Sequence, residues 1–181
     1  LGGLVGGVVP RWRSPAIRGH GIPEVMERVL VGESRGPPRV TLLKPIGSAI
    51  SIGTGGPFGA EGPIIASGGA LGSLVGQALR VTADERKTLL AAGAAAGMSA
   101  VFGAPVSATL LAVELLLFEY RPRSLAPVAL ASAAAAGFRI AVHGPAAVFP
   151  MEFIATPSGR ALVAYTVIGV LIGWLGVVIT K

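Results

Sequence analysis

Two short turns in this sequence combine residue types that can bind an anion. They are Gly19-His20-Gly21-Ile22-Pro23, followed by Glu24, and Gly59-Ala60-Glu61-Gly62-Pro63. Each places glycines before a proline that suits the start of a helix, because proline lacks the N–H that is unpaired there. A helix N-terminus carries free N–H groups and about half a positive charge, so it binds anions without a basic side chain. Neither turn fits the nucleotide motifs GxGxxG or GxxxxGK(S/T), so we expect a small anion as ligand and no other cofactor.

Glu61 is the one ionisable side chain in residues 51–69. A carboxylate inside a membrane is a functional hypothesis by default. At the positive end of a helix, its ionised form would occupy the place of the anion, and its protonated form would move aside. We therefore interpret Glu61 as a gate and proton carrier. The alternative is a carboxylate that only caps its helix.

The composition is that of a membrane protein. Of 181 residues, 52% are hydrophobic and 13% charged, whereas soluble domains are about 25% charged. The mean hydropathy is +0.72. The sequence contains no cysteine, which excludes thiol catalysis and thiolate metal sites. Uncharged runs cover residues 45–60, 62–79, 88–113, 124–138 and 161–180.

The net charge of +6 comes from basic residues that flank these runs. This position is typical of solvated cytoplasmic loops under the positive-inside rule, so we expect a lipid bilayer as partner and no nucleic acid. The residues are Arg28, Arg35, Arg39, Lys44, Arg80, Arg86, Lys87, Arg121 and Arg123. The same rule places Lys181 inside and the segment between Arg139 and Arg160 outside.

Gly103-Ala104-Pro105 interrupts the longest uncharged run. Proline ends a helix, so the run predicts two helices, about Ala83–Val101 and Pro105–Phe118, which return the chain to the same side. Thr82 and Glu85 have the spacing of a capping box at the first helix. Small residues at four-residue spacing predict close helix packing: Gly68, Gly72 and Gly76; Gly93 and Gly97; Gly169 and Gly173.

We predict an all-α integral membrane protein, with residues 1–181 forming one partial transmembrane domain of a longer chain. The expected segments are the end of an early helix (1–10), a first turn with a short helix (19–30), a broken helix pair with the second turn (44–80), a helix hairpin (83–118), a helix (124–142), an outside loop (143–159) and a further helix (160–181).

The motifs GHGIPE and GAEGP, with LLAAGAAAGMSAVFGAPVSATLLAVE behind them, resemble the CLC chloride channels and chloride/proton antiporters, whose filter motifs are GSGIP and GREGP. The resemblance covers nearly the whole chain. It implies a bundle of tilted and broken helices, comprising most of the first inverted repeat and the start of the second. It also implies a homodimer in the cell membrane with one anion pathway in each subunit. By this likeness Glu61 falls on the gating glutamate, and His20 on the serine that usually contacts the anion.

The sequence departs from the CLC pattern at several positions. His20 replaces the serine, which puts selectivity between chloride and fluoride in question, and Ala60 replaces the arginine of GREGP. Glu114 falls on the first of two adjacent glutamates of many antiporters, and Leu115 falls on the second, the internal proton acceptor. Glu114 is either on a proton path or a salt-bridge partner at a helix end. For Glu24 we expect pairing with its own helix N-terminus rather than contact with the ion.

These observations favour selective movement of chloride-like anions through a pathway formed by helix N-termini. Proton-coupled antiport, of chloride or of fluoride, is the alternative, because Leu115 supplies no proton acceptor. An intramembrane enzyme that uses Glu61 as acid or base is the less favoured hypothesis, since the uncharged runs offer no second catalytic group beside it.

Overall fold

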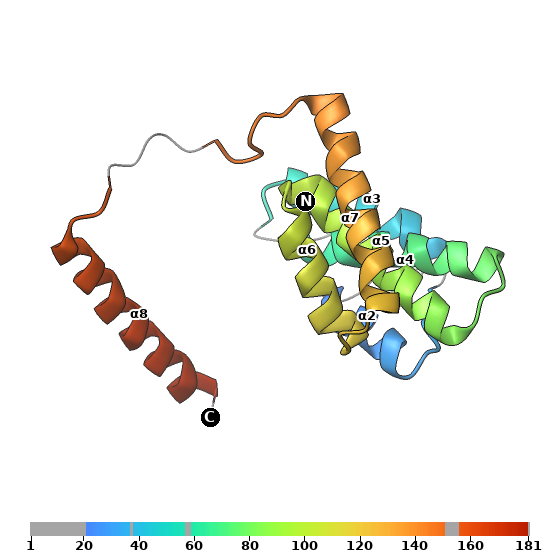
Figure 1. Ribbon diagram of the computed structural model, residues 1–181, viewed down its shortest axis with the longest axis horizontal. Helices are drawn as coiled ribbons and strands as arrows, with labels where there is room; N and C mark the ends of the chain where they lie inside the picture. Colours follow the sequence, from blue (N-terminus) through green and yellow to red (C-terminus); the bar gives the residue numbers. More distant parts are fainter. Residues whose placement is uncertain (1–20, 37, 57–58, 151–155, 181) are drawn as a thin grey trace. The chain divides into compact units, whose positions relative to one another are not determined.

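The computed structural model describes residues 21–36, 38–56, 59–150 and 156–180, and its regular elements there are all helices (Figure 1). The first expected segment, residues 1–10, lies outside the described residues. The helices are α2 (Ile22–Leu30), α3 (Pro38–Gly53), α4 (Glu61–Ala78), α5 (Ala83–Phe102), α6 (Pro105–Ala112), the π-helix η2 (Val113–Leu117), α7 (Pro122–His143) and α8 (Gly159–Thr180).

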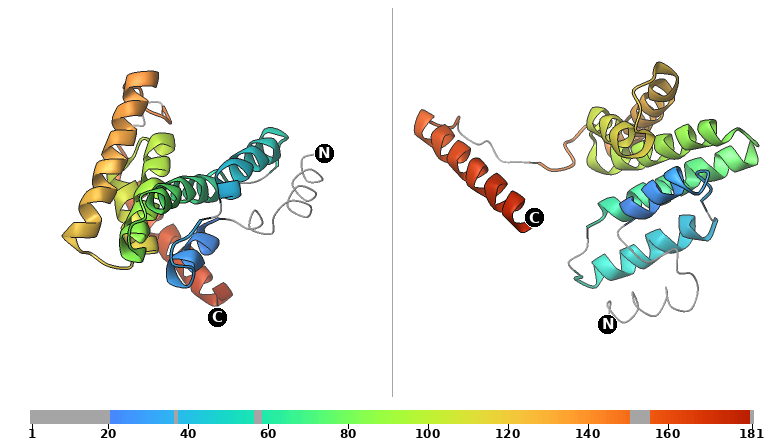
Figure 2. Two further views of the ribbon diagram at one scale, coloured as in Figure 1. Left: turned by 90° about the vertical axis from the view of Figure 1, so that its right-hand side faces the viewer. Right: turned by 90° about the horizontal axis from the view of Figure 1, so that it is seen from below.

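The chain forms two compact units, Leu1–Val148 and Phe149–Lys181. The second contains α8, a helix of 22 residues. In the first unit, α5 is the central helix and packs against α4, α6 and α7, while α2 and α3 pack against α4. Figure 2 shows α4 and α5 running side by side.

Glycines allow the close approach of α4 and α5. A Cβ atom at Gly68 would collide with the carbonyl oxygen of Gly93, and one at Gly93 would collide with that of Gly68. A Cβ at Gly72 would collide with the carbonyl oxygen of Leu89. Because backbone meets backbone at these points, the predicted packing role of the four-residue glycine spacing is confirmed for this pair of helices.

The start of α5 has the predicted cap. The backbone N–H of Thr82 donates to the Glu85 carboxylate at 2.9 Å, and the N–H of Glu85 donates to the Thr82 hydroxyl at 3.3 Å. The helix ends at Phe102, one residue beyond the predicted end, because Gly103 adopts a left-handed conformation with φ of 64°. Pro105 then begins α6.

The second helix of the hairpin differs from the prediction. A single helix was expected over Pro105–Phe118, but the α-helix ends at Ala112 and continues as the π-helix η2 over Val113–Leu117. Phe118 follows with φ of 56°, which stops the helix. π-Helices occur mostly as single-turn insertions in α-helices, and these are frequently found at functional sites. The local residue pattern did not predict this one.

Two basic residues are not the solvated loop charges that were expected. Lys44 lies within α3 and is 4% exposed, and Arg86 lies in α5 and is 6% exposed. Buried cations need partners. Arg86 has one, because its Nε donates to the carbonyl oxygen of Glu33 at 2.9 Å. Lys44 interacts electrostatically with Glu24.

Two of the described helices are long and apolar enough to cross a bilayer: Pro122–His143, and Gly159–Ile179 within α8. The all-α fold predicted from the sequence is confirmed for the described residues.

Candidate functional site

The N-terminal turns of α2 and α4 touch through their backbones. Gly21 precedes α2 with φ of 100°, a conformation that favours glycine. A Cβ atom built there would collide with the carbonyl oxygen of Gly62, in the first turn of α4. Only a glycine at position 21 therefore allows the two helix N-termini to meet at this distance.

The start of α2 contains a carboxylate that pairs with its own helix. The backbone N–H of Gly21 donates to the Glu24 carboxylate at 2.7 Å, which confirms the expectation for Glu24. Pro23 has no N–H to offer. The first-turn amides of Ile22 and Glu24 lack a partner within the helix, as at any helix N-terminus.

The start of α4 is open. Its N-cap is Ala60, which supplies no side-chain cap, and Glu61 is the first helical residue. The first intrahelical bond runs from the N–H of Ile64 to the carbonyl oxygen of Ala60 at 3.1 Å. The amides of Glu61 and Gly62 precede that bond and therefore have no intrahelical partner. This end of α4 has the free donors that an anion needs.

The Glu61 side chain is exposed and makes no hydrogen bond or ion pair with any other described residue. It lines a cavity of about 200 Å³ whose walls come from five helices. Glu61 and Ser107 are the polar side chains of this lining. The lining residues are Ile22, Glu61, Ile65, Met98, Phe102, Ala104, Ser107, Ala108, Leu111 and Leu115.

The π-helix η2 contributes one residue to the lining of this cavity. Leu115 is half-buried and lines it, whereas Glu114 is exposed and does not. The end of η2 is held by Lys87, whose Nζ donates to the carbonyl oxygen of Leu117 at 2.8 Å and lies 6.0 Å from the centre of the Phe118 ring. A cation at a helix C-terminus is favourable because it complements the helix dipole.

The structure brings together part of the predicted anion-binding set. Gly21, Ile22 and Pro23 begin α2, and Glu61, Gly62 and Pro63 begin α4 in contact with it. Gly59 and Ala60 are exposed and lead into α4. Gly19 and His20 lie outside the described residues, and so does the predicted contact of His20 with an anion.

The sequence analysis did not predict the α6 wall of the cavity. Ala104, Ser107, Ala108 and Leu111 line it together with Leu115, and their spacing follows one helical face. That face was visible in the sequence, but nothing local indicated that it would lie opposite Glu61 rather than against lipid.

Comparison with known proteins places the chain in a family. The family model described as voltage gated chloride channel matches residues 1–181. The chain belongs to the voltage-gated chloride channel family. It is 34% identical over 171 residues to an H(+)/Cl(-) exchange transporter ClcA of Vibrio campbellii, covering 93% of this chain and 36% of that protein. It is 27% identical over 179 residues to a putative chloride channel protein ClcB-like of Ralstonia nicotianae, covering 97% of this chain and 42% of that one.

A solved structure of the family supports the fold. The crystal structure of a slow cyanobacterial Cl-/H+ antiporter matches with a TM-score of 0.79 at 26% sequence identity, covering 97% of this chain and 42% of that chain. The chain thus spans about two fifths of the length of these relatives. Membership of this family indicates that the chain belongs to a membrane protein, in agreement with the hydropathy of its helices.

Proposed function

We propose that the full-length protein moves small chloride-like anions across a membrane, along a pathway formed by the N-termini of α2 and α4. The observation that carries this proposal is the backbone contact between Gly21 and Gly62. It brings two positive helix ends together where neither has a basic side chain. Such paired helix ends attract anions without trapping them as a nearby lysine or arginine would.

In this proposal Glu61 is the gate. Its carboxylate stands at the N-terminus of α4 without a partner among the described residues. Ionised, it competes with the anion for the amides of Glu61 and Gly62. Protonated, it loses that attraction and withdraws, and the adjoining cavity offers it room. Anion movement then depends on pH, because the gate opens when Glu61 gains a proton.

Proton coupling is the finer part of the proposal. The relatives named as H(+)/Cl(-) exchange transporters and the Cl-/H+ antiporter structure support exchange, whereas the relative named as a putative chloride channel supports uncoupled conduction. In this chain the described lining of the cavity holds one carboxylate, Glu61. Beyond Glu61, a proton that crosses the cavity needs water or the Ser107 hydroxyl as a carrier, since Leu115 cannot carry it. The names of the matched relatives lend no support to the enzyme hypothesis.

We also propose that the full-length protein crosses the cell membrane several times and forms a homodimer with one anion pathway in each subunit. The test is flux from vesicles that contain the full-length protein. Chloride and fluoride efflux are compared at several pH values, for the unchanged protein and for Glu61→Gln. Absence of flux of either ion, from protein shown to be folded, would reject the function.

A further inference from the structure

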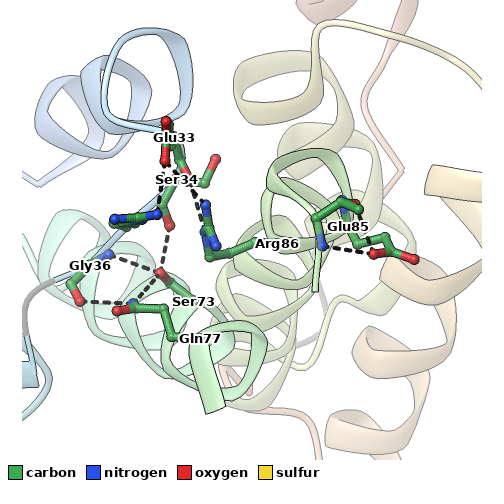
Figure 3. A network of polar contacts seen from close by, with 9 residues as sticks. Glu33, Ser34, Gly36, Ser73, Gln77, Glu85 and Arg86 are labelled. Carbon is green, nitrogen blue, oxygen red and sulfur yellow. Dashed lines mark hydrogen bonds and ion pairs between the residues drawn. The ribbon is translucent and has the colours of Figure 1, made fainter. Parts of the chain in front are cut away.

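A polar cluster ties the loop after α2 to α4, at the end of both helices that lies away from the predicted anion site (Figure 3). Ser73 of α4 is its centre. The Ser73 hydroxyl accepts a hydrogen bond from the N–H of Gly36 at 2.8 Å and donates to the carbonyl oxygen of Ser34 at 2.5 Å. The Gln77 side-chain amide donates to the carbonyl oxygen of Gly36 and to the Ser73 hydroxyl, both at 3.1 Å.

Arg86 of α5 completes this cluster, which we call the loop clamp. Its Nε donates to the carbonyl oxygen of Glu33 at 2.9 Å, and its Nη2 lies 3.8 Å from the Glu33 carboxylate. Arg35 approaches the same carboxylate at 3.1 Å from the solvent side. Figure 3 shows Arg86 reaching from α5 toward Glu33 while Ser73 and Gln77 meet Gly36. The loop clamp is Glu33, Ser34, Gly36, Ser73, Gln77 and Arg86.

The clamp holds a backbone that would not otherwise keep its shape. Glu33 and Ser34 both have left-handed conformations, with φ of 49° and 56°. Non-glycine residues stay in such conformations only when their surroundings hold them there. The loop is also joined to the last turn of α2, because Gly32 and Ser34 donate their N–H groups to the carbonyl oxygen of Arg28 at 3.0 and 2.9 Å.

The short helix α2 is therefore fixed to α4 at two points. Its N-terminal end meets Gly62 through Gly21. Its C-terminal loop is held by Ser73, which lies twelve residues after Glu61 in α4, a distance of roughly 18 Å along a helix. With nine residues in α2, a shift of the clamped loop moves the helix as a rigid body and displaces the amides at its N-terminus.

We propose that Ser73 and Arg86 are positioning residues for the anion site. They set the position of α2 along α4, and through it the distance between the two helix N-termini. They touch no anion themselves. This inference rests on the proposed function, because it concerns the same pair of helix ends.

The test uses the full-length protein in vesicles and measures chloride flux against chloride concentration. Ser73→Ala removes the centre of the clamp. Ser99→Ala is the matched control, because Ser99 is equally buried and donates one hydrogen bond, to the carbonyl oxygen of Ser132 at 2.7 Å. Ser73→Ala removes all three hydrogen bonds of the hydroxyl, so we expect it to raise the chloride concentration at half-maximal flux by at least about fivefold, the net effect of a single hydrogen bond. Ser99→Ala should leave that concentration unchanged.

A purely structural role for Ser73 would lower the maximal flux of Ser73→Ala without changing its half-saturating concentration, and that result would overturn the proposal. If Ser73→Ala does not fold, Arg86→Met decides, because methionine keeps an unbranched side chain but has no N–H donor for the Glu33 carbonyl. An unchanged half-saturating concentration in Arg86→Met would overturn the proposal as well. Glu61→Gln is measured in parallel. If this variant keeps the pH dependence of flux, the proposed gate is wrong. If only the positioning role of Ser73 and Arg86 is wrong, Glu61→Gln still loses the pH dependence.

Discussion

Leu115 of η2 lines the same cavity as Glu61 of α4, whereas its neighbour Glu114 is exposed and does not. The relationship assigns different roles to two adjacent residues. A side chain at position 115 can exchange protons or water with Glu61 through the cavity. A carboxylate at position 114 lies outside that space and acts on Glu61 only through the bulk solvent or at long range.

The first prediction concerns this pair of neighbours. Leu115→Glu places a second titratable group in the cavity of Glu61, so we expect faster proton movement driven by a chloride gradient. Glu114→Gln should leave proton movement unchanged. Both are measured as pH changes in vesicles held at zero membrane potential. Loss of proton movement in Glu114→Gln, with none gained in Leu115→Glu, would place the proton path on the other face of η2.

A second prediction tests the contact between the two helix N-termini. Gly21→Ala adds a methyl group that collides with the carbonyl oxygen of Gly62, so we expect chloride flux to fall strongly. Gly55→Ala is the matched control, because Gly55 also has a positive φ, 84°, but its added methyl group meets open space. Equal flux in the two variants would show that the contact is not needed for transport.

The third prediction concerns the packing of α4 against α5. Gly93→Ala forces a methyl group against the carbonyl oxygen of Gly68, and overpacking of this kind costs about 1–3 kcal/mol of stability. Gly47→Ala, in α3, adds its methyl group to open space. Thermal unfolding in detergent should show a lower midpoint for Gly93→Ala alone. Equal unfolding midpoints for the two variants would show that the close contact of α4 with α5 does not contribute to the stability of the protein.

A fourth prediction concerns His20 in the first turn. If His20 contacts the anion, as the resemblance to the CLC family implies, His20→Ser should change the ratio of chloride to fluoride flux much more than the yield of folded protein. A ring nitrogen and a hydroxyl differ in donor strength and in titration near neutral pH. The same ratio in both proteins would remove His20 from the selectivity of the pathway.

Local features of this fold were predictable from the sequence. The cap of Thr82 and Glu85, the pairing of Glu24 with its own helix, and the glycine contact of Gly68 with Gly93 each follow from spacing along one or two helices. The resemblance to the CLC family also implied that both proline-containing turns belong to one anion pathway.

Features that depend on distant contacts were not predictable. In the sequence, Arg86 is one of several charged residues at a predicted membrane interface. Its burial depends on a hydrogen bond to the carbonyl oxygen of Glu33, 53 residues away in the chain. In the sequence, Ser73 is one of many small residues of α4, and its role depends on the hydrogen bond from Gly36, 37 residues away in the chain. The π-helix η2 was not predictable either: its last residue, Leu117, accepts a hydrogen bond from Lys87, 30 residues away in the chain.

The central claim is that protonation of Glu61 opens an anion pathway, and the pH dependence of chloride flux tests it most directly. The measurement compares the full-length protein with Glu61→Gln in vesicles over a range of external pH, with Glu114→Gln as the control carboxylate. We predict that flux through the unchanged protein and through Glu114→Gln varies with pH. Flux through Glu61→Gln, which mimics the protonated gate, should be at least as large and independent of pH. A Glu61→Gln protein whose flux keeps the original pH dependence would contradict the account.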